Sequence, residues 1–527
     1  MMGRRIRNGT VAVALVVCVV LAALNLRLAV KPMKQLLAGK KSPKETAEAI
    51  AENYRSDDLI GKYPAITLNG LFARLSGRRV YNEVTLLNNG ALTGRVSTAT
   101  NPLKVNEKDI DRVADLASMA EKFGSAFLYV QRPYKEPLEG GLFPAGTRLI
   151  DTPKAEMNVA AMKQRGINTL DLIPLISATV EDSNRNFYRT DHHWNADGAL
   201  KAYGYILQAM EEALGVPLDK SSADPENWER HELKNWWIGS RGKRVGPLFA
   251  GTDSLIWYTP KFETGRISRA NLKENGFISG SFEDACMRLW HTESQDFYNH
   301  NDYYVYIGSD GTVHSLRNDQ APNKLRVLMI KSSYGIPILA YLATAFTEVD
   351  SLDPRYYTAS TVAQYIDWTK PDIVMVVSNE SILDNECVTA DQDGEKQKAW
   401  REAHREMEEV LRLEDLRIEA RAEKRNAVTV AKVEKGKVYR LRLDQVTVDQ
   451  GETEGISVNL AKKGEKNAAD CMVFDIAYCN RHGYEWTFAV PEDKSPDAEY
   501  ELQICAGVYG KTEQIGITCH GLVLQRE

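Results

Sequence analysis

The segment from Tyr188 to Asn195 holds the residue types and spacing best suited to chemistry. It reads Tyr-Arg-Thr-Asp-His-His-Trp-Asn, so Asp191 precedes His193 by two positions. In an extended backbone, residues at i and i+2 point to the same side. The Asp191 carboxylate can then hold the His193 imidazole in one tautomer, which is the role of the acid in a Ser-His-Asp triad. The segment therefore predicts a hydrolase-like site if a nucleophile lies nearby.

A metal cluster or a structural turn would also use an aspartate beside two histidines. Adjacent side chains of an extended segment point apart, so His192 and His193 would rarely bind one ion. No further ligand cluster of convincing spacing accompanies them. We expect no metal and no cofactor, and we expect His192 and Trp194 to serve packing.

A candidate nucleophile follows the apolar run Leu325–Ile330, which predicts a buried strand. Ser332 and Ser333 come next, and a helix is expected over Ile336–Phe346. Open α/β sheets bind ligands at the carboxyl ends of their strands. A serine at such a turn exposes its hydroxyl, and N–H groups at the helix start can face an oxyanion. A serine there is more often only a cap, and Ser332 fits that role.

The elements around these motifs alternate between strand and helix, which predicts a doubly wound parallel sheet. Apolar spacing predicts a helix over Asp109–Phe123, and Asn195 is a predicted cap of a helix that Gly215 ends. Residues 220–320, rich in Trp, Tyr and Gly, predict an irregular insertion. The strands expected in the sheet span residues 126–130, 169–173, 325–330, 347–352 and 373–377.

Several side chains near the ends of these strands are candidates for the rim of the site. An arginine there can clamp an acyl oxygen or an acidic sugar, and an asparagine can donate to an oxyanion. Two tryptophans in the insertion are either a platform for sugar stacking or core residues. A surface or loop role is the alternative for each of the others. The candidate substrate-binding or oxyanion residues are Tyr334, Arg355, Tyr356, Asn379, Arg132, Trp236 and Trp237.

The composition and the N-terminal segment indicate a folded protein outside the cytoplasm that does not bind nucleic acid. With 527 residues, 43% of them hydrophobic, the chain predicts two or three folded domains. A net charge of −6 gives no basic field for nucleic acid, and no Walker or dinucleotide-binding loop is found. Three arginines before the apolar run Thr10–Leu24 predict an uncleaved membrane anchor with the bulk of the chain outside. The alternative is a cleaved signal peptide and a secreted protein.

These features predict a division of the chain into five parts. Four cysteines near the C-terminus (Cys471, Cys479, Cys505 and Cys519) would either form disulfides outside the cell or be buried as thiols. The predicted parts are a signal-anchor or transmembrane segment (1–30), a stalk and start of the catalytic domain (31–75), the catalytic domain (76–394), a charged helical connector (395–426) and a β-sandwich that is a candidate carbohydrate-binding module (427–527).

Taken together, the two motifs resemble the DHHW protein family, named for the tetrapeptide found here at Asp191–Trp194. That family is similar to the alginate O-acetyltransferases AlgJ and AlgX, which are relatives of the SGNH hydrolases. The resemblance spans roughly residues 55–385 and includes Gly239-Ser240, Tyr304–Gly311 and Asp353–Tyr357. It implies an SGNH-like domain.

The resemblance also implies roles for single residues. Ser333 matches the nucleophile, His193 its base and Asp191 the residue that orients the base. One position departs, because the family segment usually reads Lys-Asp-Ser-Tyr and Ser332 stands here in place of that aspartate. A serine can replace an acid that only shapes the turn, but not one that tunes the charge of the site.

The function expected from motif and resemblance is O-acetylation of a cell-surface or secreted polysaccharide outside the cytoplasm, through an acetyl-serine intermediate. The acetyltransferase relatives work beside a multipass membrane-bound O-acyltransferase (MBOAT-type) partner, which implies such an acetyl donor here. One alternative is a polysaccharide acetyl-esterase with the same triad. A second is a catalytically degenerate surface protein that binds polysaccharide.

Overall fold

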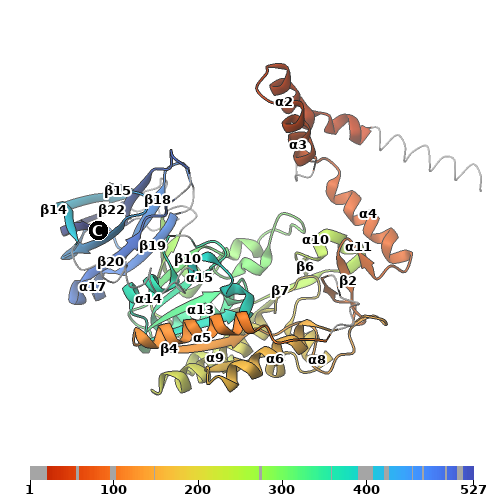
Figure 1. Ribbon diagram of the computed structural model, residues 1–527, viewed down its shortest axis with the longest axis horizontal. Coiled ribbons are helices and arrows are strands. Elements are labelled where there is room, and N and C mark those ends of the chain that lie inside the picture. Colours follow the sequence, from red (N-terminus) through yellow and green to blue (C-terminus); the bar gives the residue numbers. More distant parts are fainter. Residues whose placement is uncertain are drawn as a thin grey trace, which may run out of the picture.

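A mixed eight-stranded sheet forms the centre of the molecule (Figure 1). Five neighbouring strands of this sheet run parallel, and helices cover both of its faces. The parallel strands, in spatial order, are β5 (Thr169–Asp171), β4 (Ala126–Gln131), β13 (Ile373–Ser378), β11 (Asn323–Lys331) and β12 (Phe346–Leu352). The computed structural model describes residues 20–54, 59–94, 96, 102–147, 149–271, 276–357, 359–389, 407–420, 427–453, 455–465, 468–492, 495–506 and 514–527.

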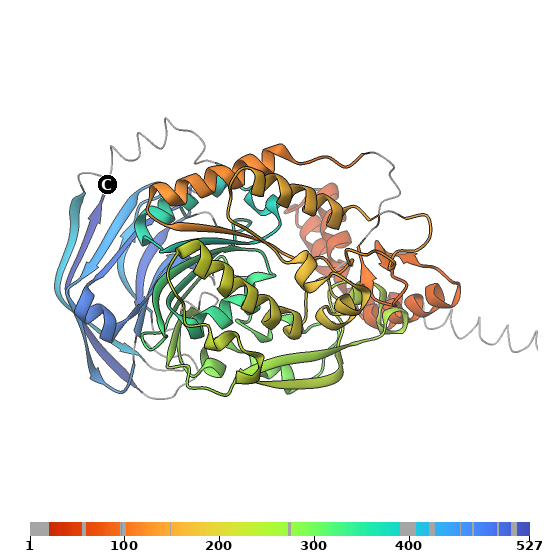
Figure 2. The same cartoon turned by 90° about the horizontal axis from the view of Figure 1, so that it is seen from below.

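Alternate side chains of β11 enter two different hydrophobic cores, as the period of a strand requires. Leu328 and Ile330 face the core that also contains apolar residues of α5 (Glu107–Lys122) and α14 (Val362–Thr369). Val327 and Met329 face the core with α9 (Ala196–Leu214) and α13 (Gly335–Ala345). Figure 2 shows α5 and α9 on opposite sides of the sheet. The predicted α/β architecture is therefore confirmed.

The helix α9 begins and ends where the sequence indicates. The Asn195 side chain accepts a hydrogen bond from the Gly198 N–H at 2.9 Å, and Gly215 ends the helix with φ of 68°. The remaining helices near the sheet are α6 (Asp151–Gln164), α7 (Ile173–Ile176), α8 (Val180–Asn186), α12 (Phe282–Cys286) and α15 (Glu386–Thr389).

The prediction of an irregular insertion over residues 220–320 is wrong for much of its length. β6 (Trp228–Trp237) and β7 (Asp253–Pro260) form a long hairpin. Three further strands extend the central sheet in antiparallel fashion, in the order β12-β10-β8-β9. The sequence hides β10 because all of its residues are buried, including Ser315 and Arg317, which contact Met472 of the C-terminal domain. These strands are β10 (Val313–Arg317), β8 (Ile267–Asn271) and β9 (Gly276–Gly280).

The N-terminal segment of the described chain is helical. α4 (Lys62–Leu75) packs on α11 (Pro247–Ala250) and on α10 (Gly242–Val245), where a side chain on Gly70 would collide with the Val245 carbonyl oxygen. Most of the predicted anchor, residues 1–19, lies outside the described residues. Within the described ranges, no helix has the length and apolarity needed to cross a membrane. The other elements here are α2 (Arg27–Leu37), α3 (Pro43–Asn53), β1 (Val80–Tyr81), β2 (Val84–Leu86) and β3 (Leu92–Thr93).

A C-terminal domain of two antiparallel sheets packs beside the central sheet (Figure 1). One sheet has the order β14-β22-β16-β20, with β17 also paired to β22, and the other has the order β15-β21-β18-β19. Its four cysteines, Cys471, Cys479, Cys505 and Cys519, are all buried. The elements are β14 (Glu408–Ala420), β15 (Ala427–Val433), β16 (Val438–Leu443), β17 (Gln445–Gln450), β18 (Gly455–Lys462), β19 (Ala468–Asp475), α17 (Ile476–His482), β20 (Tyr484–Ala489), β21 (Tyr500–Cys505) and β22 (Ile515–Arg526).

The charged helical connector predicted over 395–426 is contradicted at residues 408–420, which form the strand β14. Its many charges suggested a solvated helix, yet Leu411 and Leu413 are less exposed than the charged residues between and beside them. A bulge near Glu409 and the edge position of the strand obscure this alternation. The rest of the predicted connector, apart from residue 407, lies outside the described residues.

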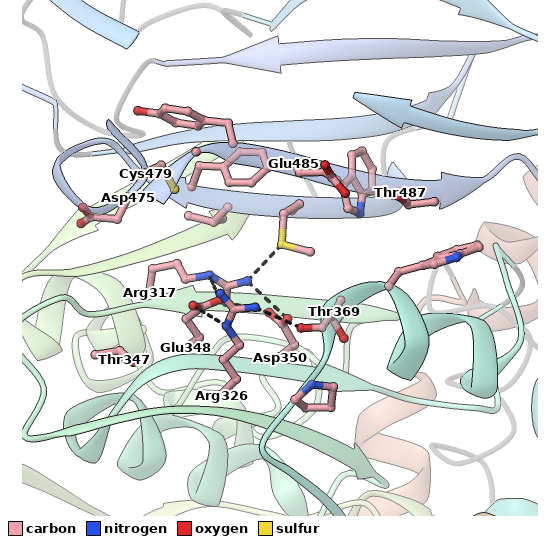
Figure 3. A pocket seen from close by; sticks show the side chains of 18 of the residues that line it. Arg317, Arg326, Thr347, Glu348, Asp350, Thr369, Asp475, Cys479, Glu485 and Thr487 are labelled. Carbon is pink, nitrogen blue, oxygen red and sulfur yellow. Dashed lines mark hydrogen bonds and ion pairs between the residues drawn. The ribbon is translucent and has the colours of Figure 1, made fainter. Parts of the chain in front are cut away.

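A cavity of about 480 Å³ lies between the central sheet and the C-terminal domain (Figure 3). Charged residues of the sheet line one wall, and residues of β19 and β20 line the other. The charges are paired, since Arg317 contacts Asp350 at 2.8 Å and Arg326 contacts Glu348 at 2.9 Å.

Candidate active site

Ser333 lies in the turn between β11 and α13, at the carboxyl end of the sheet. Its side chain is largely buried, with 8% of the residue exposed. The turn is tight, because the N–H groups of Gly335 and Ile336 donate to the carbonyls of Ser332 and Ser333. Gly335 is needed there, since a side chain would come within 2.7 Å of the Lys331 Cβ. The turn therefore presents the Ser333 hydroxyl in a fixed position.

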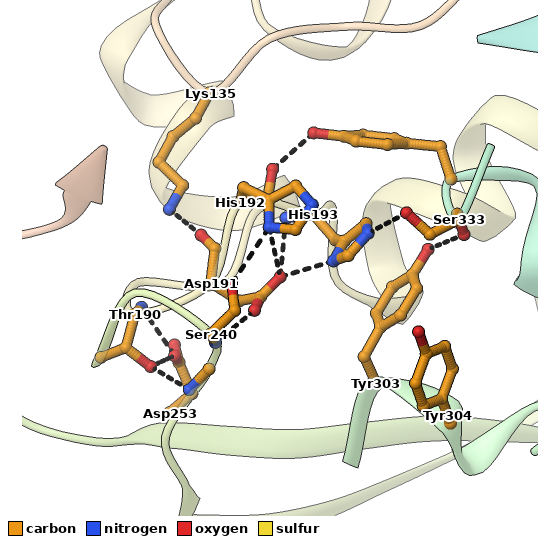
Figure 4. Close-up of polar contacts among 12 residues, drawn as sticks. Lys135, Thr190, Asp191, His192, His193, Ser240, Asp253, Tyr303, Tyr304 and Ser333 are labelled. Carbon is orange, nitrogen blue, oxygen red and sulfur yellow. Dashed lines mark hydrogen bonds and ion pairs between the residues drawn. The ribbon is translucent and has the colours of Figure 1, made fainter. Parts of the chain in front are cut away.

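The His193 imidazole connects Ser333 to Asp191 (Figure 4). Its Nε2 lies 2.6 Å from the Ser333 Oγ, and its Nδ1 lies 2.5 Å from the Asp191 Oδ1. All three side chains are at least nine-tenths buried. A serine, a histidine and an aspartate in this line can move a proton from the hydroxyl to the imidazole while the carboxylate holds the ring. The structure thus brings together the three residues that the sequence singles out.

Asp191 and His193 meet because their segment bends, whereas the sequence predicts an extended segment. Residues 188–193 form a loop closed by pairing between Phe187 and Trp194, so the segment is not extended. The Asp191 Oδ1 accepts the His193 N–H at 3.0 Å as well as its ring nitrogen. Local hydrogen bonding of an aspartate to the residue two positions on is a common turn device.

A second loop, after β6, fixes the other oxygen of Asp191. The Ser240 N–H donates to the Asp191 Oδ2 at 2.7 Å. A Cβ on Gly239 would lie 2.2 Å from the Asp191 Cβ, so only glycine allows this approach. Burial alone would raise the pKa of Asp191, but the His193 charge and hydrogen bond hold that pKa well below its usual range. Asp191 is thus an ionised and fully bonded carboxylate.

Two buried charged residues that the sequence argument missed brace the backbone of the loop. Asp253 accepts the Thr190 N–H at 2.7 Å and also the Thr190 hydroxyl. The Lys135 ammonium donates to the carbonyls of Leu92, at 2.9 Å, and Asp191. Burial lowers the pKa of Lys135 to about 8. Neither residue has a motif around it, and only the fold places them here.

Aromatic rings enclose the imidazole. The Tyr303 ring is stacked on His193 with 3.8 Å between centroids, and its hydroxyl donates to the Ser333 carbonyl at 2.8 Å. Tyr334, predicted as a substrate contact, is buried, and its hydroxyl donates to the His192 carbonyl. Trp194 is buried against Tyr334, as predicted. Tyr303 has no sequence signal of its own, since it lies in the insertion.

The two histidines of the motif do not point apart, as an extended segment would require. Because the segment bends, the rings of His192 and His193 lie 3.7 Å apart, and ligand atoms of both histidines and Asp191 lie within 4.8 Å of one another. The Nε2 of His193 is nevertheless directed at Ser333. Burial lowers the pKa of His192 to about 3, which keeps this ring neutral.

The predicted rim residues differ in how they lie. The Arg132 guanidinium lies 4.7 Å from the Tyr334 ring centroid, close to the nucleophile turn. The Asn379 amide nitrogen donates to the Ser381 hydroxyl at 2.8 Å, and its oxygen accepts from Ser378, so this side chain is bonded locally. Arg132 therefore fits a substrate contact better than Asn379 fits an oxyanion donor.

Arg355 and Tyr356 form a more exposed part of the rim. The Arg355 guanidinium pairs with both carboxylate oxygens of Asp353, and this hydrogen bonding raises the Arg355 pKa above its usual value. It also lies 5.1 Å from the Tyr356 ring centroid. Because two guanidinium nitrogens of Arg355 already donate to Asp353, Arg355 is less available to bind a substrate anion than the sequence suggests.

The two tryptophans predicted as a sugar platform have separate places. Trp237 is fully buried and packs edge-on against Tyr188 at 4.8 Å, so its role as a platform is wrong. Trp236 is half-buried, and its Nε1 donates to the His291 carbonyl at 2.9 Å. Alternation along β6 explains the difference, because neighbouring residues of a strand face opposite sides.

Ser332, which stands where the family segment usually has an aspartate, does not use its side chain to hold the turn. Its hydroxyl is buried and has no hydrogen-bond partner among the described residues. The N–H of Ser332 donates to the Val377 carbonyl at 3.4 Å, and its carbonyl accepts from Gly335. The turn is therefore held by the backbone of Ser332 and not by its side chain.

Two family models match the part of the chain that carries this site. The model described as the SGNH hydrolase-like domain of the acetyltransferase AlgX matches residues 97–232, and the DHHW protein model matches residues 167–352. The comparison with curated proteins found no match.

Solved structures also resemble the chain. Bacillus cereus PatB1, with a sulfonyl adduct, is 21% identical with a TM-score of 0.47, covering 58% of this chain and 97% of its own. A DHHW family protein from Eubacterium siraeum is 14% identical with a TM-score of 0.40, covering 58% and 98%. The O-acetyltransferase domain of Pseudomonas putida AlgJ is 13% identical with a TM-score of 0.34, covering 61% and 99%. According to the two family models, residues 97–352 are similar to the DHHW and AlgX-type SGNH hydrolase-like domains.

Proposed function

We propose that the chain is an O-acetyltransferase that acts on a polysaccharide through an acetyl-serine intermediate. The observation that carries the proposal is the line of short contacts from the Ser333 Oγ through His193 to Asp191. The match to the AlgX acetyltransferase model supports acetyl transfer as the reaction. The partner and the location expected from the sequence, an MBOAT-type acetyl donor and an anchored domain outside the cytoplasm, are part of this proposal.

In the first half-reaction, His193 Nε2 removes the proton of Ser333 as its Oγ attacks the acetyl carbonyl carbon. The tetrahedral intermediate collapses, the bond from the carbonyl carbon to the donor's leaving group breaks, and His193 returns the proton to that group. Among the described residues, no hydrogen bond uses the N–H of Ser333 or Tyr334. We propose these two N–H groups as the backbone donors to the developing oxyanion.

In the second half-reaction, a sugar hydroxyl takes the place of the leaving group. His193 removes its proton, the hydroxyl oxygen bonds to the acetyl carbon, and the Ser333 oxygen leaves with the proton. If water enters instead, the same steps give an acetyl-esterase. The triad serves both reactions equally, so the acceptor that reaches the acetyl-serine decides between them.

The test is partitioning of acetyl groups from p-nitrophenyl acetate in the presence of neutral and uronate oligosaccharides. We expect acetylated oligosaccharide, detected by mass spectrometry, in addition to free acetate. The Ser333→Ala variant should give neither product above background, whereas Ser332→Ala is the matched control with an intact nucleophile. If free acetate is the only product with every oligosaccharide, the protein is an esterase and not a transferase. If the folded wild type gives neither product, the alternative function, a catalytically degenerate protein that only binds polysaccharide, is favoured.

A further inference from the structure

We infer that His291, His300 and Asp302 form a binding site for a divalent transition-metal ion, best matched by Zn²⁺. These residues belong to the segment around η4 (Leu289–Thr292) and η5 (Asp302–Val305), in the insertion that follows β9. One ligand atom from each lies within 4.8 Å of the others. Two imidazoles and a carboxylate are the ligand set of many zinc sites, with a remaining position for water or substrate.

Hydrogen bonding inside the cluster accounts for only part of its polar atoms. The His291 Nδ1 lies 2.8 Å from the Asp302 Oδ1, which pairs these two side chains. The other oxygen of Asp302, whose residue is fully buried, has no partner among the described residues. The Nδ1 of His300 is likewise buried without a partner in the described part of the chain. Unpaired buried polar atoms are costly, and a cation between them would satisfy both.

The surroundings of the cluster hold it in place and shield it. The His291 carbonyl accepts from Trp236 at 2.9 Å, and the His300 carbonyl accepts from the Lys243 ammonium. The Trp290 ring is stacked on His291 at 3.8 Å and meets His300 edge-on. These contacts fix the backbone on both sides of the cluster and use none of its ring nitrogens or carboxylate oxygens. Contacts that orient metal ligands contribute to the affinity of a metal site.

The site lies next to the catalytic machinery in sequence. Asp302 precedes Tyr303, whose ring is stacked on His193 and whose hydroxyl holds the Ser333 carbonyl. An ion bound by Asp302 would therefore restrain the segment that carries Tyr303. The role inferred for the metal is to stabilise this segment, so its binding is detected without any assay of acetyl transfer.

The test is Zn²⁺ binding by the full chain after removal of metal with EDTA. We expect one Zn²⁺ per chain by elemental analysis after dialysis, and a rise of Tm on addition of Zn²⁺. His300→Ala should weaken Zn²⁺ binding on the order of 100-fold and abolish the rise of Tm. Because His300 is only half-buried, this variant is expected to fold, which circular dichroism checks. Asp302→Asn should have the same effect.

The cluster of Asp191, His192 and His193 is the competing site, so His192→Ala is the matched control. This variant should bind Zn²⁺ as the wild type does. Loss of binding in His192→Ala with retention in His300→Ala would overturn the inference, and so would a metal-free wild type that takes up no Zn²⁺.

Discussion

The Tyr303 ring lies parallel to the His193 imidazole, with 3.8 Å between centroids and 10° between the planes. The same tyrosine donates its hydroxyl to the Ser333 carbonyl at 2.8 Å. One side chain therefore positions both the base and the nucleophile of the proposed triad, although it lies in an insertion that shows no motif.

This relationship predicts different results for two substitutions of Tyr303. Tyr303→Ala removes the stacking, which is worth about 0.5–1.5 kcal/mol beyond burial, and should lower kcat roughly 2–10-fold or more. Tyr303→Phe keeps the ring and loses only the hydroxyl, so its kcat should lie closer to that of the wild type. Steady-state kinetics with p-nitrophenyl acetate measures both. Equal kcat values for Tyr303→Ala and the wild type would show that the stacking does not position the base.

The contact between Gly239 and Asp191 predicts that Gly239→Ala damages the site. An added Cβ would lie 2.2 Å from the Asp191 Cβ, and overpacking of this kind costs about 1–3 kcal/mol. The shift of Asp191 should also lower kcat. Gly204→Ala, in α9, is the control, because its Cβ would meet its nearest atom at 3.8 Å. Urea denaturation should show lower stability for the first variant and unchanged or higher stability for the second.

The buried Lys135 predicts a pH-dependent stability. Its pKa falls from 10.5 to about 8 on burial, so between these pH values the unfolded chain binds the proton and the folded chain does not. The stability of the folded state then rises with pH in this window, by up to about 1.4 kcal/mol per pH unit. The free energy of unfolding of the wild type, minus that of Lys135→Met, should therefore increase from pH 8 to pH 10. If this difference stays constant or decreases with pH, burial does not lower the pKa of Lys135.

Ser332 is predicted to be replaceable. Its hydroxyl makes no hydrogen bond among the described residues, and the turn is held by its backbone. Ser332→Ala should therefore keep kcat within about twofold of the wild type, since removing an unpaired hydroxyl removes no interaction. A tenfold loss in the same assay would mean that the hydroxyl contacts the substrate.

The sequence predicted the residues of the site better than their surroundings. Ser333, His193 and Asp191 stand in motifs, and the alternation of strands and helices implied that their elements meet at one edge of a sheet. The bend that joins Asp191 to His193 was not predictable, because it depends on the Ser240 loop and on Asp253, which are distant in sequence. Long-range contacts of this kind leave no local periodicity.

Burial explains most of the errors in the fold. The strand β10 has polar residues that are buried because another domain covers them, so the alternation expected of a strand is absent. In β14 the charges suggested a helix, but they belong to an edge strand with one partly covered face. Trp236 and Trp237 do not form one platform, because a strand turns adjacent side chains to opposite sides. The alternative of core burial holds for Trp237.

The central claim is that Ser333 carries the acetyl group, and intact-protein mass spectrometry after brief exposure to p-nitrophenyl acetate tests it most directly. The wild type should gain the mass of one acetyl group, located on Ser333 by peptide mapping. The rate of adduct formation should fall on the order of 10³-fold or more in His193→Ala. Ser333→Ala should not form the adduct. An acetyl group on another residue, or the same adduct in Ser333→Ala, would contradict the account.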